Sequence, residues 1–256
     1  MTTATLLPRG IAPLIRSEAR LFTRDFGNVF FALAFPAIVL VGVGLLIPGM
    51  DEIIPNGPGA GLATIVVMIP PVLATAMATP ALTTMPGIIA GYREQGVLTR
   101  LATTPMRPSG VVGAQIVIGV VSFLVATALA LIVGSLVFDL VMPVSPALVV
   151  LSLLLGAAAI FAVGMIIAAR ASKASTAQGI AMLVFFPMLF FAGLWTPEPI
   201  MPDLVADIAS WTPLGAASQA LSAGWLGGSM PWQQLAVLAG YTVLSTAIAV
   251  RFFRWK

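Results

Sequence analysis

Residues 147–169, ALVVLSLLLGAAAIFAVGMIIAA, form an uncharged apolar run that follows Pro146 and ends at Arg170. At 1.5 Å per residue, a helix of this length reaches roughly 35 Å, enough to cross the ~30 Å hydrocarbon core of a bilayer. Similar runs recur along the chain, which is 59% hydrophobic and 8% charged, with a mean hydropathy of +1.07. A soluble domain carries about a quarter charged residues. The composition therefore predicts an all-α membrane protein rather than a soluble protein with a large buried core.

We expect six spans, separated by prolines, glycines or charged residues. They lie at residues 28–47, 60–82, 112–137, 147–169, 176–195 and 232–250. Uncharged residues continue past the second span as far as Tyr92, further than one crossing needs. Because Pro80 and Pro86 kink or break a helix, this span should bend and continue into the cytoplasm.

Residues 9–26 have the pattern of a helix that lies on the membrane surface. Arg16, Arg20 and Arg24 repeat every four residues and form one stripe, and apolar residues populate much of the opposite side. In such a helix the basic side faces anionic headgroups and the apolar side enters the lipid. A solvated basic tail is the alternative, but the apolar positions recur too regularly for it.

A segment of different composition, residues 196–231, separates the last two spans. It contains several prolines, glycines and acids, and Leu204, Ile208 and Trp211 fall on one helical face. We interpret it as two short helices that re-enter the outer leaflet. Because residues 213–230 carry no charge, two additional spans remain an alternative, which the glutamine, serines and glycines of this stretch disfavour.

Positive charge is confined to one side of the six-span topology. All twelve Lys and Arg fall in residues 1–27, 83–111, 170–175 and 251–256. Cytoplasmic loops carry an excess of Lys and Arg, so both ends of the chain are expected in the cytoplasm. The same distribution explains a pI of about 10.0 without nucleic acid. We treat residues 1–256 as one transmembrane domain.

Several kinds of chemistry lack their residues in this sequence. There is no Cys and no His, which removes thiolate nucleophiles, zinc ligation of the usual kind and imidazole catalysis. Ser229, after two glycines, therefore has no His to activate it as a nucleophile. Neither Lys173 nor Lys256 follows a glycine as in a P-loop, so any ATP must bind another polypeptide. We expect no catalytic residue, metal site or cofactor on this chain.

No ionisable residue lies in the middle of an expected span. Ion-coupled carriers usually need intramembrane carboxylates or cations, and voltage sensors need a ladder of arginines. The sequence therefore disfavours a self-sufficient secondary transporter, although a sodium site of carbonyls and hydroxyls is still conceivable.

The largest cytoplasmic loop contains GYREQGVLTRLATTPMRP, residues 91–108. Val97, Leu98 and Leu101 form the apolar side of a short amphipathic helix, which Pro105 ends because proline cannot continue it. A loop that only sets topology needs charge but no helix. A docking surface for a cytosolic partner explains more of this pattern.

This loop resembles the cytoplasmic loop of type-2 permeases of ATP-binding-cassette exporters, in which Arg-Glu and a Gly precede Leu, Arg, Leu and Thr-Pro. The second half is similar too: Phe191-Ala-Gly-Leu-Trp-Thr-Pro197 resembles the family's apolar–Gly–Pro segment, and Thr212-Pro-Leu214 its Asn-Pro-Leu-type turn. Thr212 replaces the common Asn, and Val97 replaces a small polar residue. The resemblance covers nearly the whole chain and is nearest to the drug- and antibiotic-resistance exporters of the daunorubicin type.

The resemblance implies a permease subunit of the bacterial inner (plasma) membrane that exports a hydrophobic or amphipathic substrate such as a drug, antibiotic or lipid. It would dimerise with itself or a paralogous permease and bind two copies of a cytosolic ATPase, which holds ATP and Mg. Residues 91–107 would dock on that ATPase, and its closure would tilt spans 1, 2 and 5. The implied coupling residues are Arg93, Glu94, Gln95, Leu98, Arg100, Leu101, Thr104, Pro105 and Arg107.

In the fifth span, Leu183, Phe186, Phe190 and Gly193 recur at three- and four-residue spacing and are expected to line the substrate path. Ordinary helix or lipid packing is the alternative for each of them. Two other functional classes stay open at this point: a carrier or channel that works without ATP, and a membrane scaffold or importer subunit.

Overall fold

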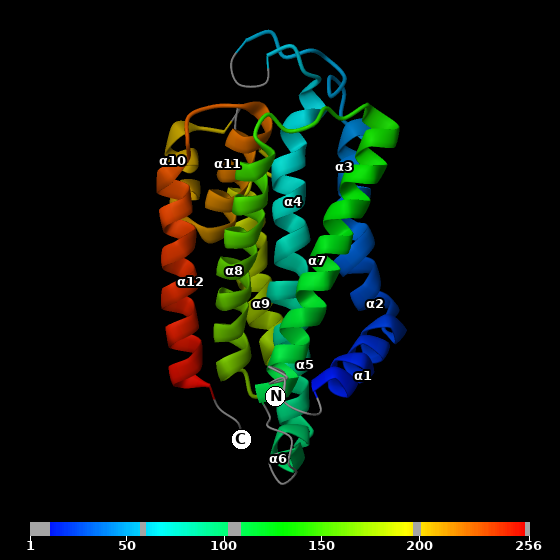
Figure 1. Cartoon of the computed structure of the whole chain (residues 1–256), viewed down its shortest axis with the longest axis vertical. Helices are drawn as coiled ribbons and strands as arrows, with labels where there is room; N and C mark the ends of the chain where they lie inside the picture. The colour runs from blue at the N-terminus through cyan, green and yellow to red at the C-terminus, as the bar shows by residue number, and fades with distance from the viewer. Residues whose placement is uncertain (1–10, 57–59, 102–108, 197–200, 254–256) are drawn as a thin grey trace, which may run out of the picture.

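The computed structural model describes residues 11–56, 60–101, 109–196 and 201–253. Within these ranges the regular structure is helical, apart from an isolated bridge between Ile53 and Ala63. Six helical segments are long and apolar enough to cross a membrane, and they form one bundle (Figure 1). They are Phe26–Leu46, Thr64–Glu94, Ser109–Phe138, Pro146–Arg170, Ala174–Phe191 and Trp232–Phe252. This confirms the prediction of an all-α membrane protein with six spans.

Two of the spans are built from several helical segments. The first comprises α2 (Phe26–Val29), a π-helical turn (Phe30–Ala34) and α3 (Phe35–Leu46), and the second comprises a 3₁₀ turn (Thr64–Met68), α4 (Ile69–Ala78), a π-helical turn (Thr79–Thr84) and α5 (Met85–Glu94). The others are α7 (Ser109–Phe138), α8 (Pro146–Arg170), α9 (Ala174–Phe191) and α12 (Trp232–Phe252). In the second span, Pro70, Pro80 and Pro86 each follow a change of helix type, from 3₁₀ to α, from α to π and from π to α, and such changes accommodate the backbone hydrogen bond that a proline cannot make. The helix therefore continues from Thr64 to Glu94 without ending at its prolines.

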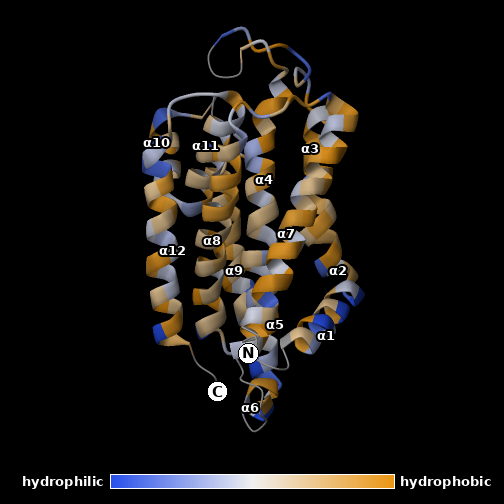
Figure 2. Ribbon diagram, viewed as in Figure 1, coloured by the Kyte–Doolittle hydropathy of each residue, from blue (hydrophilic) through white to orange (hydrophobic). Residues whose placement is uncertain are grey.

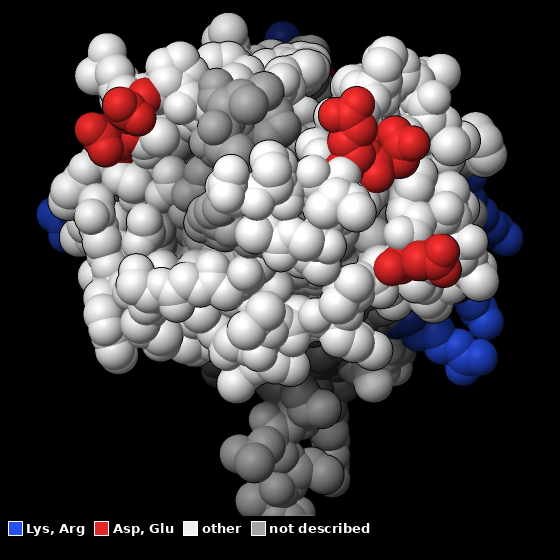
Figure 3. Space-filling model, turned by 90° about the horizontal axis from the view of Figure 1, so that it is seen from above, with Lys and Arg blue, Asp and Glu red and all other residues white. Residues whose placement is uncertain are grey.

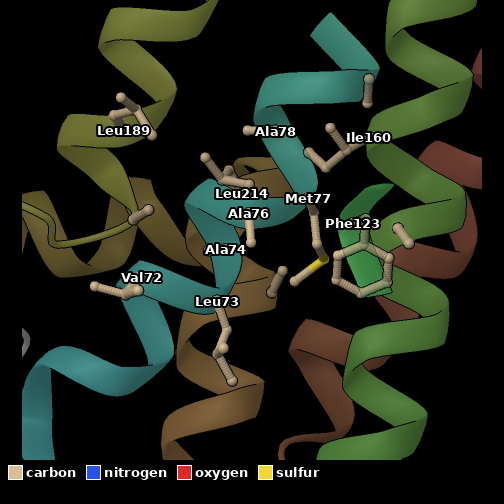
Figure 4. Close-up of a cluster of buried hydrophobic side chains, with 14 of the residues drawn as sticks. Val72, Leu73, Ala74, Ala76, Met77, Ala78, Phe123, Ile160, Leu189 and Leu214 are labelled. Atoms are coloured by element: carbon tan, nitrogen blue, oxygen red, sulfur yellow. The ribbon is translucent and has the colours of Figure 1, made fainter. Parts of the chain in front are cut away.

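The second span lies at the centre of the bundle. Its most apolar stretch of 18 residues is entirely buried. Met77 of α4 meets Phe123 of α7 and Ile160 of α8 in the core (Figure 4). Gly164 lets α8 approach the second span closely, because a Cβ there would lie 2.0 Å from the carbonyl oxygen of Ala81. The hydroxyls of Thr75, Thr79 and Thr83 donate to carbonyl oxygens one turn earlier, so they need no partner on another helix. A movement of this span must therefore repack its neighbours.

Helix α1 (Ile11–Arg24) precedes the first span and packs beside α7 at the lower end of the bundle in Figure 1. Phe22 is buried, whereas Arg16, Arg20 and Arg24 are exposed. Figure 2 shows both hydrophilic and apolar residues along α1, as expected for a helix with one side of each kind. The structure confirms the amphipathic N-terminal helix.

Two short helices, α10 (Asp203–Trp211) and α11 (Pro213–Leu226), stand between the last two spans. The Thr212 hydroxyl accepts a hydrogen bond from the Gly215 N–H at 3.2 Å and caps α11. With 14 residues, α11 is about 21 Å long, too short to cross the hydrocarbon core. Its C-terminal end returns to the α7–α8 connection, where the Ser145 N–H donates to the Gly224 carbonyl at 2.9 Å. The pair therefore re-enters the bundle and does not add two spans.

The two ends of the bundle carry charge of opposite sign. Acidic side chains stand on the face seen from above, and the cations lie behind its rim (Figure 3). The acids of the connections at this end are Asp51, Glu52, Asp139, Asp203 and Asp207. Described cations occupy the elements of the other end: Arg16, Arg20, Arg24, Arg93, Arg100, Arg170, Lys173 and Arg251.

Candidate functional site

At the basic end, the second span projects beyond its neighbours and turns back into a short helix. Helix α5 ends at Glu94, Gln95 and Gly96 form the turn, and α6 covers Val97–Leu101 (Figure 1). Gly96 has φ +70°, a conformation that glycine adopts readily and that commonly ends a helix. The predicted coupling segment thus begins as a direct extension of the central helix.

Arg93, at the end of α5, is fastened to the ends of two other spans. Its Nη1 donates to the carbonyl oxygen of Ala168 at 2.9 Å and to that of Ala171, at the C-terminal end of α8. Its guanidinium also lies 5.4 Å from the centre of the Phe253 ring, just after α12. A cation is favourable at a helix C-terminus and over an aromatic face. Arg93 therefore holds α5 to α8 and α12.

Glu94, the next residue, is fastened to a different span. Its Oε2 accepts a hydrogen bond from the backbone N–H of Ala174, the first residue of α9, at 3.0 Å. A carboxylate at a helix N-terminus satisfies an otherwise unpaired N–H and complements the helix dipole. Glu94 is exposed to solvent, so this contact is a surface one.

A buried carboxylate links the same region to the N-terminal helix. Glu18 of α1 is only 7% exposed, and its Oε2 accepts from the Tyr92 hydroxyl at 2.7 Å and from Gln115 Nε2 of α7 at 2.6 Å. A buried carboxylate is tolerated only where hydrogen bonds replace its hydration. The cluster therefore joins α1, α5 and α7 through one acceptor atom.

The predicted coupling residues divide into two groups. Arg93 and Glu94 make the contacts above, and the side chain of Leu98 is buried, with 1% exposure. Gln95 and Arg100 are exposed, and Leu101 is half-buried. Thr104, Pro105 and Arg107 lie outside the described residues.

Of the four predicted path residues of the fifth span, three are exposed and one is buried. Leu183, Phe186 and Phe190 are 78%, 54% and 39% exposed and share one side of α9, whereas Leu189 is buried in the core (Figure 4). Gly193 is buried with φ +86°, and its N–H donates to the Phe190 carbonyl at 3.0 Å. It terminates α9, which is why the helix ends at Phe191 and not at residue 195 as expected.

At the acidic end, a cavity of about 700 Å³ opens between the 3₁₀ turn Thr64–Met68, α11, the start of α12 and the connections around them. Its polar lining is uncharged and includes Gln219, Gln233 and Gln234, and the amide Nε2 of Gln234 donates to Gln219 Oε1 at 3.1 Å. The predicted path residues of α9 are not among those that line it.

Glu18, Tyr92 and Gln115 were not predicted from the sequence as members of a site. One signal for Glu18 is present: it lies between Leu14 and Phe22 at four-residue spacing, so an acid interrupts the apolar side of α1. Its partners, 74 and 97 positions away, have no comparable local signal.

The comparison with curated proteins gave no match. A family model described as ABC-2 type transporter matches residues 10–226 of the 256-residue chain. The match begins just before α1 and ends with the last residue of α11, so it includes α5, α6 and the contacts described above, apart from those of Phe253 and Gln234.

Proposed function

Because the chain belongs to the ABC-2 type transporter family, as a multi-pass membrane permease, we propose that it is the transmembrane subunit of an ATP-driven exporter. Members of this family generally work with an ABC ATPase subunit. ATP hydrolysis would reside on that partner, bound in two copies to a dimer of permeases. The observation that carries the proposal is the continuous helix Thr64–Glu94, which connects an exposed turn to the centre of the bundle.

The contacts around α5 suit the transmission of force. Arg93 ties its end to α8 and α12, Glu94 ties it to α9, and Tyr92 ties it to α1 and α7 through Glu18. A displacement of α6 therefore acts on five helices at once. ATP binding that stabilises one position of α6 over another would shift the bundle between two states by differential affinity.

The surface offered to the ATPase would be the exposed part of the turn and α6. Gln95 and Arg100 supply polar and cationic groups there, and the half-buried Leu101 supplies an apolar contact. Thr104, Pro105 and Arg107 extend this surface in sequence. Leu98 is buried instead and offers no surface to a partner.

The exposed side of α9 fits a substrate path or a permease–permease contact. Leu183, Phe186 and Phe190 are apolar and uncharged, so they favour a hydrophobic or amphipathic molecule over an ion. In a two-fold dimer the same surface of both copies would enclose one path. Drug-like substrates, as in exporters of the daunorubicin type, fit this chemistry.

The segregation of charge supports a plasma-membrane protein with both termini in the cytoplasm. Arg93, Arg100 and the cations of α1 then face the ATPase side, and the α10–α11 pair and the acidic end face outward.

The direct test is purification of the tagged permease in mild detergent from its native host. An ABC ATPase should co-purify, and the complex in proteoliposomes should move amphipathic drugs such as daunorubicin in an ATP-dependent direction away from the ATPase side. Transport by the permease alone, without ATP, would instead identify a secondary carrier. Recovery without an ATPase and without transport would indicate a scaffold.

A further inference from the structure

The cavity at the acidic end has the size and the lining of a ligand site. Ligand pockets in proteins measure about 300–1,000 Å³ and combine a mostly apolar wall with a few polar groups. This cavity measures about 700 Å³ and lies beside α11, which stands between α12 and α4 at the upper end of the bundle in Figure 1. The buried side chains of Val67, Met68 and Leu226 form part of its apolar wall. Trp232, exposed at the start of α12, adds an aromatic ring to the lining.

The polar part of the lining is uncharged. Among the described residues that line the cavity there is no Asp, Glu, Lys or Arg, whereas four carry a side-chain amide: Asn56, Gln219, Gln233 and Gln234. A primary amide both donates and accepts hydrogen bonds, as a hydroxyl group does, so amides pair well with the hydroxyls of a neutral ligand. A charged ligand would leave water for a wall that offers no counter-ion, which is costly. The lining therefore favours a neutral ligand that bears several hydroxyls.

Three of these amides are held in place by hydrogen bonds among the last three helices. Nε2 of Gln219 donates to the Ala206 carbonyl of α10 at 3.1 Å, and its Oε1 accepts from Nε2 of Gln234 at 3.1 Å. Nε2 of Gln233 donates to the Ser210 hydroxyl oxygen at 3.1 Å. The Oε1 atoms of Gln233 and Gln234 make no hydrogen bond to any described residue. Because groups that are fixed before binding lose little freedom when a ligand arrives, these helices present preorganised acceptors.

The cavity adjoins the outer end of the fifth span. A much smaller cavity, of about 10 Å³, shares Val67, Gln219 and Ser222 with it and is also lined by Phe191 and Gly193, at and just after the end of α9. A space of this size holds about one water molecule, so the connection between the two is narrow. The exposed side of α9 is the proposed substrate path. The large cavity therefore lies next to the outer end of the helix that carries this path.

We propose that the large cavity binds the sugar of a neutral amphipathic glycoside at the outer face of the permease. The sugar hydroxyls pair with the amides of Asn56, Gln233 and Gln234, and the apolar part of the molecule lies against Val67. Trp232 offers an apolar ring face and an N–H donor at the same place. The proposal rests on the proposed function only for the outward orientation of the acidic end and for a glycoside that leaves there as the substrate. Binding itself is a property of this chain alone.

Saturation-transfer NMR on the full chain in nanodiscs tests the proposal with three probes that share a phenyl ring: phenyl β-D-glucoside, phenyl phosphate and phenyltrimethylammonium. Empty nanodiscs measure partition of each probe into lipid. We expect saturable binding of the glucoside, about tenfold or more tighter than that of the anion or the cation, because neither charge finds a partner in the lining. Equal binding of the three probes, or no saturable binding of the glucoside, overturns the proposal.

Removal of single amides tests the polar part of the wall. Asn56 is exposed and its side chain makes no hydrogen bond to the described residues, so Asn56→Leu should not disturb the fold. Asn56→Leu and Gln234→Leu should each weaken glucoside binding by about fivefold, the effect of one lost hydrogen bond. The matched control is Gln178→Leu, which removes an exposed amide that donates to the Thr83 carbonyl at 3.5 Å, outside the lining. It should leave binding unchanged, and wild-type binding by both cavity variants overturns the proposal.

Filling the cavity tests its volume. Ala223→Phe on α11 places a ring in it and should abolish glucoside binding, whereas Ala147→Phe, at an exposed alanine near the start of α8 and outside the lining, should not. Thermal unfolding shows whether both variants fold, and where Ala223→Phe does not, the two amide variants decide. Wild-type binding by folded Ala223→Phe overturns the proposal. Glucoside binding by a permease that recruits no ATPase would keep this site and remove the exporter, whereas an ATP-driven exporter that binds no glucoside would do the reverse.

Discussion

Oε2 of Glu94 accepts a hydrogen bond from the backbone N–H of Ala174 at 3.0 Å, across 80 positions of sequence. The preceding residue, Arg93, donates to carbonyl oxygens at the end of α8. The cationic Arg93 therefore lies at the C-terminal end of α8, and the anionic Glu94 lies at the N-terminal end of α9. Each charge complements the dipole of the helix end that it contacts, on either side of the short α8–α9 connection. This arrangement fixes the end of the central helix against the fifth span, which bears the exposed aromatic residues.

Removing the Glu94 carboxylate should break the contact between α5 and α9 at a small cost in stability. Glu94→Ala is expected to lower the free energy of unfolding by about 0.5–1 kcal/mol, as for other exposed charges at helix termini. Transport per ATP hydrolysed should fall much further, because α9 is no longer held to α5. Thermal unfolding in detergent and transport in proteoliposomes measure the two effects.

The matched control for Glu94 is Asp203→Ala, which removes an exposed acid from the first turn of α10 at the other end of the bundle. It should cost a similar amount of stability and leave the transport-to-ATPase ratio unchanged. Equal transport defects in both variants would show that the Glu94 effect is general destabilisation.

Tyr92→Phe should destabilise the permease more than its small change in size suggests. It removes one of the two donors to the buried Glu18 carboxylate, and loss of a partner for a buried polar group costs about 1–3 kcal/mol. Tyr241→Phe, at a half-buried tyrosine whose hydroxyl makes no hydrogen bond to the described residues, should cost under about 0.5 kcal/mol. Chemical denaturation of both variants measures the two stability losses. Identical midpoints would show that the hydrogen bond between Tyr92 and Glu18 does not stabilise the packing of α1.

Sequence reasoning found the spans because an uncharged run of about 20 residues is a local signal that does not depend on its neighbours. The cluster at Glu18 could not be found in this way, since a carboxylate on α1 and its donors on α5 and α7 meet only through tertiary packing. The same limit applies within α6. Leu98 and Leu101 share an apolar side in sequence, yet only the packing of α6 shows that Leu98 is buried and Leu101 half-buried.

Single cysteines test the orientation, and the chain contains no native Cys to interfere. Cysteines in place of the exposed Asn56 and Ser229 should react in intact cells with an impermeant thiol reagent. Those in place of the exposed Gln95 and Ser172 should react only after the membrane is permeabilised, because the basic end faces the cytoplasm. Labelling of position 95 from outside would invert the topology.

Truncating the exposed side chains of α9 should alter substrate handling without loss of the fold. Phe186→Ala and Leu183→Ala are expected to change the drug-stimulated ATPase activity of the complex severalfold, because each loses apolar contact with an amphipathic substrate. The control is Leu244→Ala, at a leucine of α12 that is 66% exposed. A response to Leu244→Ala as large as that to Leu183→Ala would assign both sites to lipid packing.

Charge reversal on α6 tests the proposed docking surface for the ATPase. Arg100 is exposed on α6 and its Nη2 donates locally to the Gln95 carbonyl at 3.4 Å, whereas Glu94 contacts α9, so reversal of Arg100 tests the interface and leaves the α5–α9 contact in place. Arg100→Glu should release the ATPase in pull-downs from detergent, because losing one partner of a partly buried interfacial pair can cost 2–5 kcal/mol in order of magnitude, against under about 1 kcal/mol for a solvated pair. The same reversal at Arg16, exposed on α1, should leave ATPase binding intact.

The two leucines of α6 separate docking from folding in the same pull-down. Leu98→Ala removes a side chain that is 1% exposed and should lower permease stability by about 2–5 kcal/mol. Leu101→Ala should cost little stability and instead weaken ATPase binding, because part of its side chain remains available to a partner. If Arg100→Glu and Leu101→Ala both retain the ATPase and full export, α6 is not the docking element, and the coupling must pass through another cytoplasmic surface.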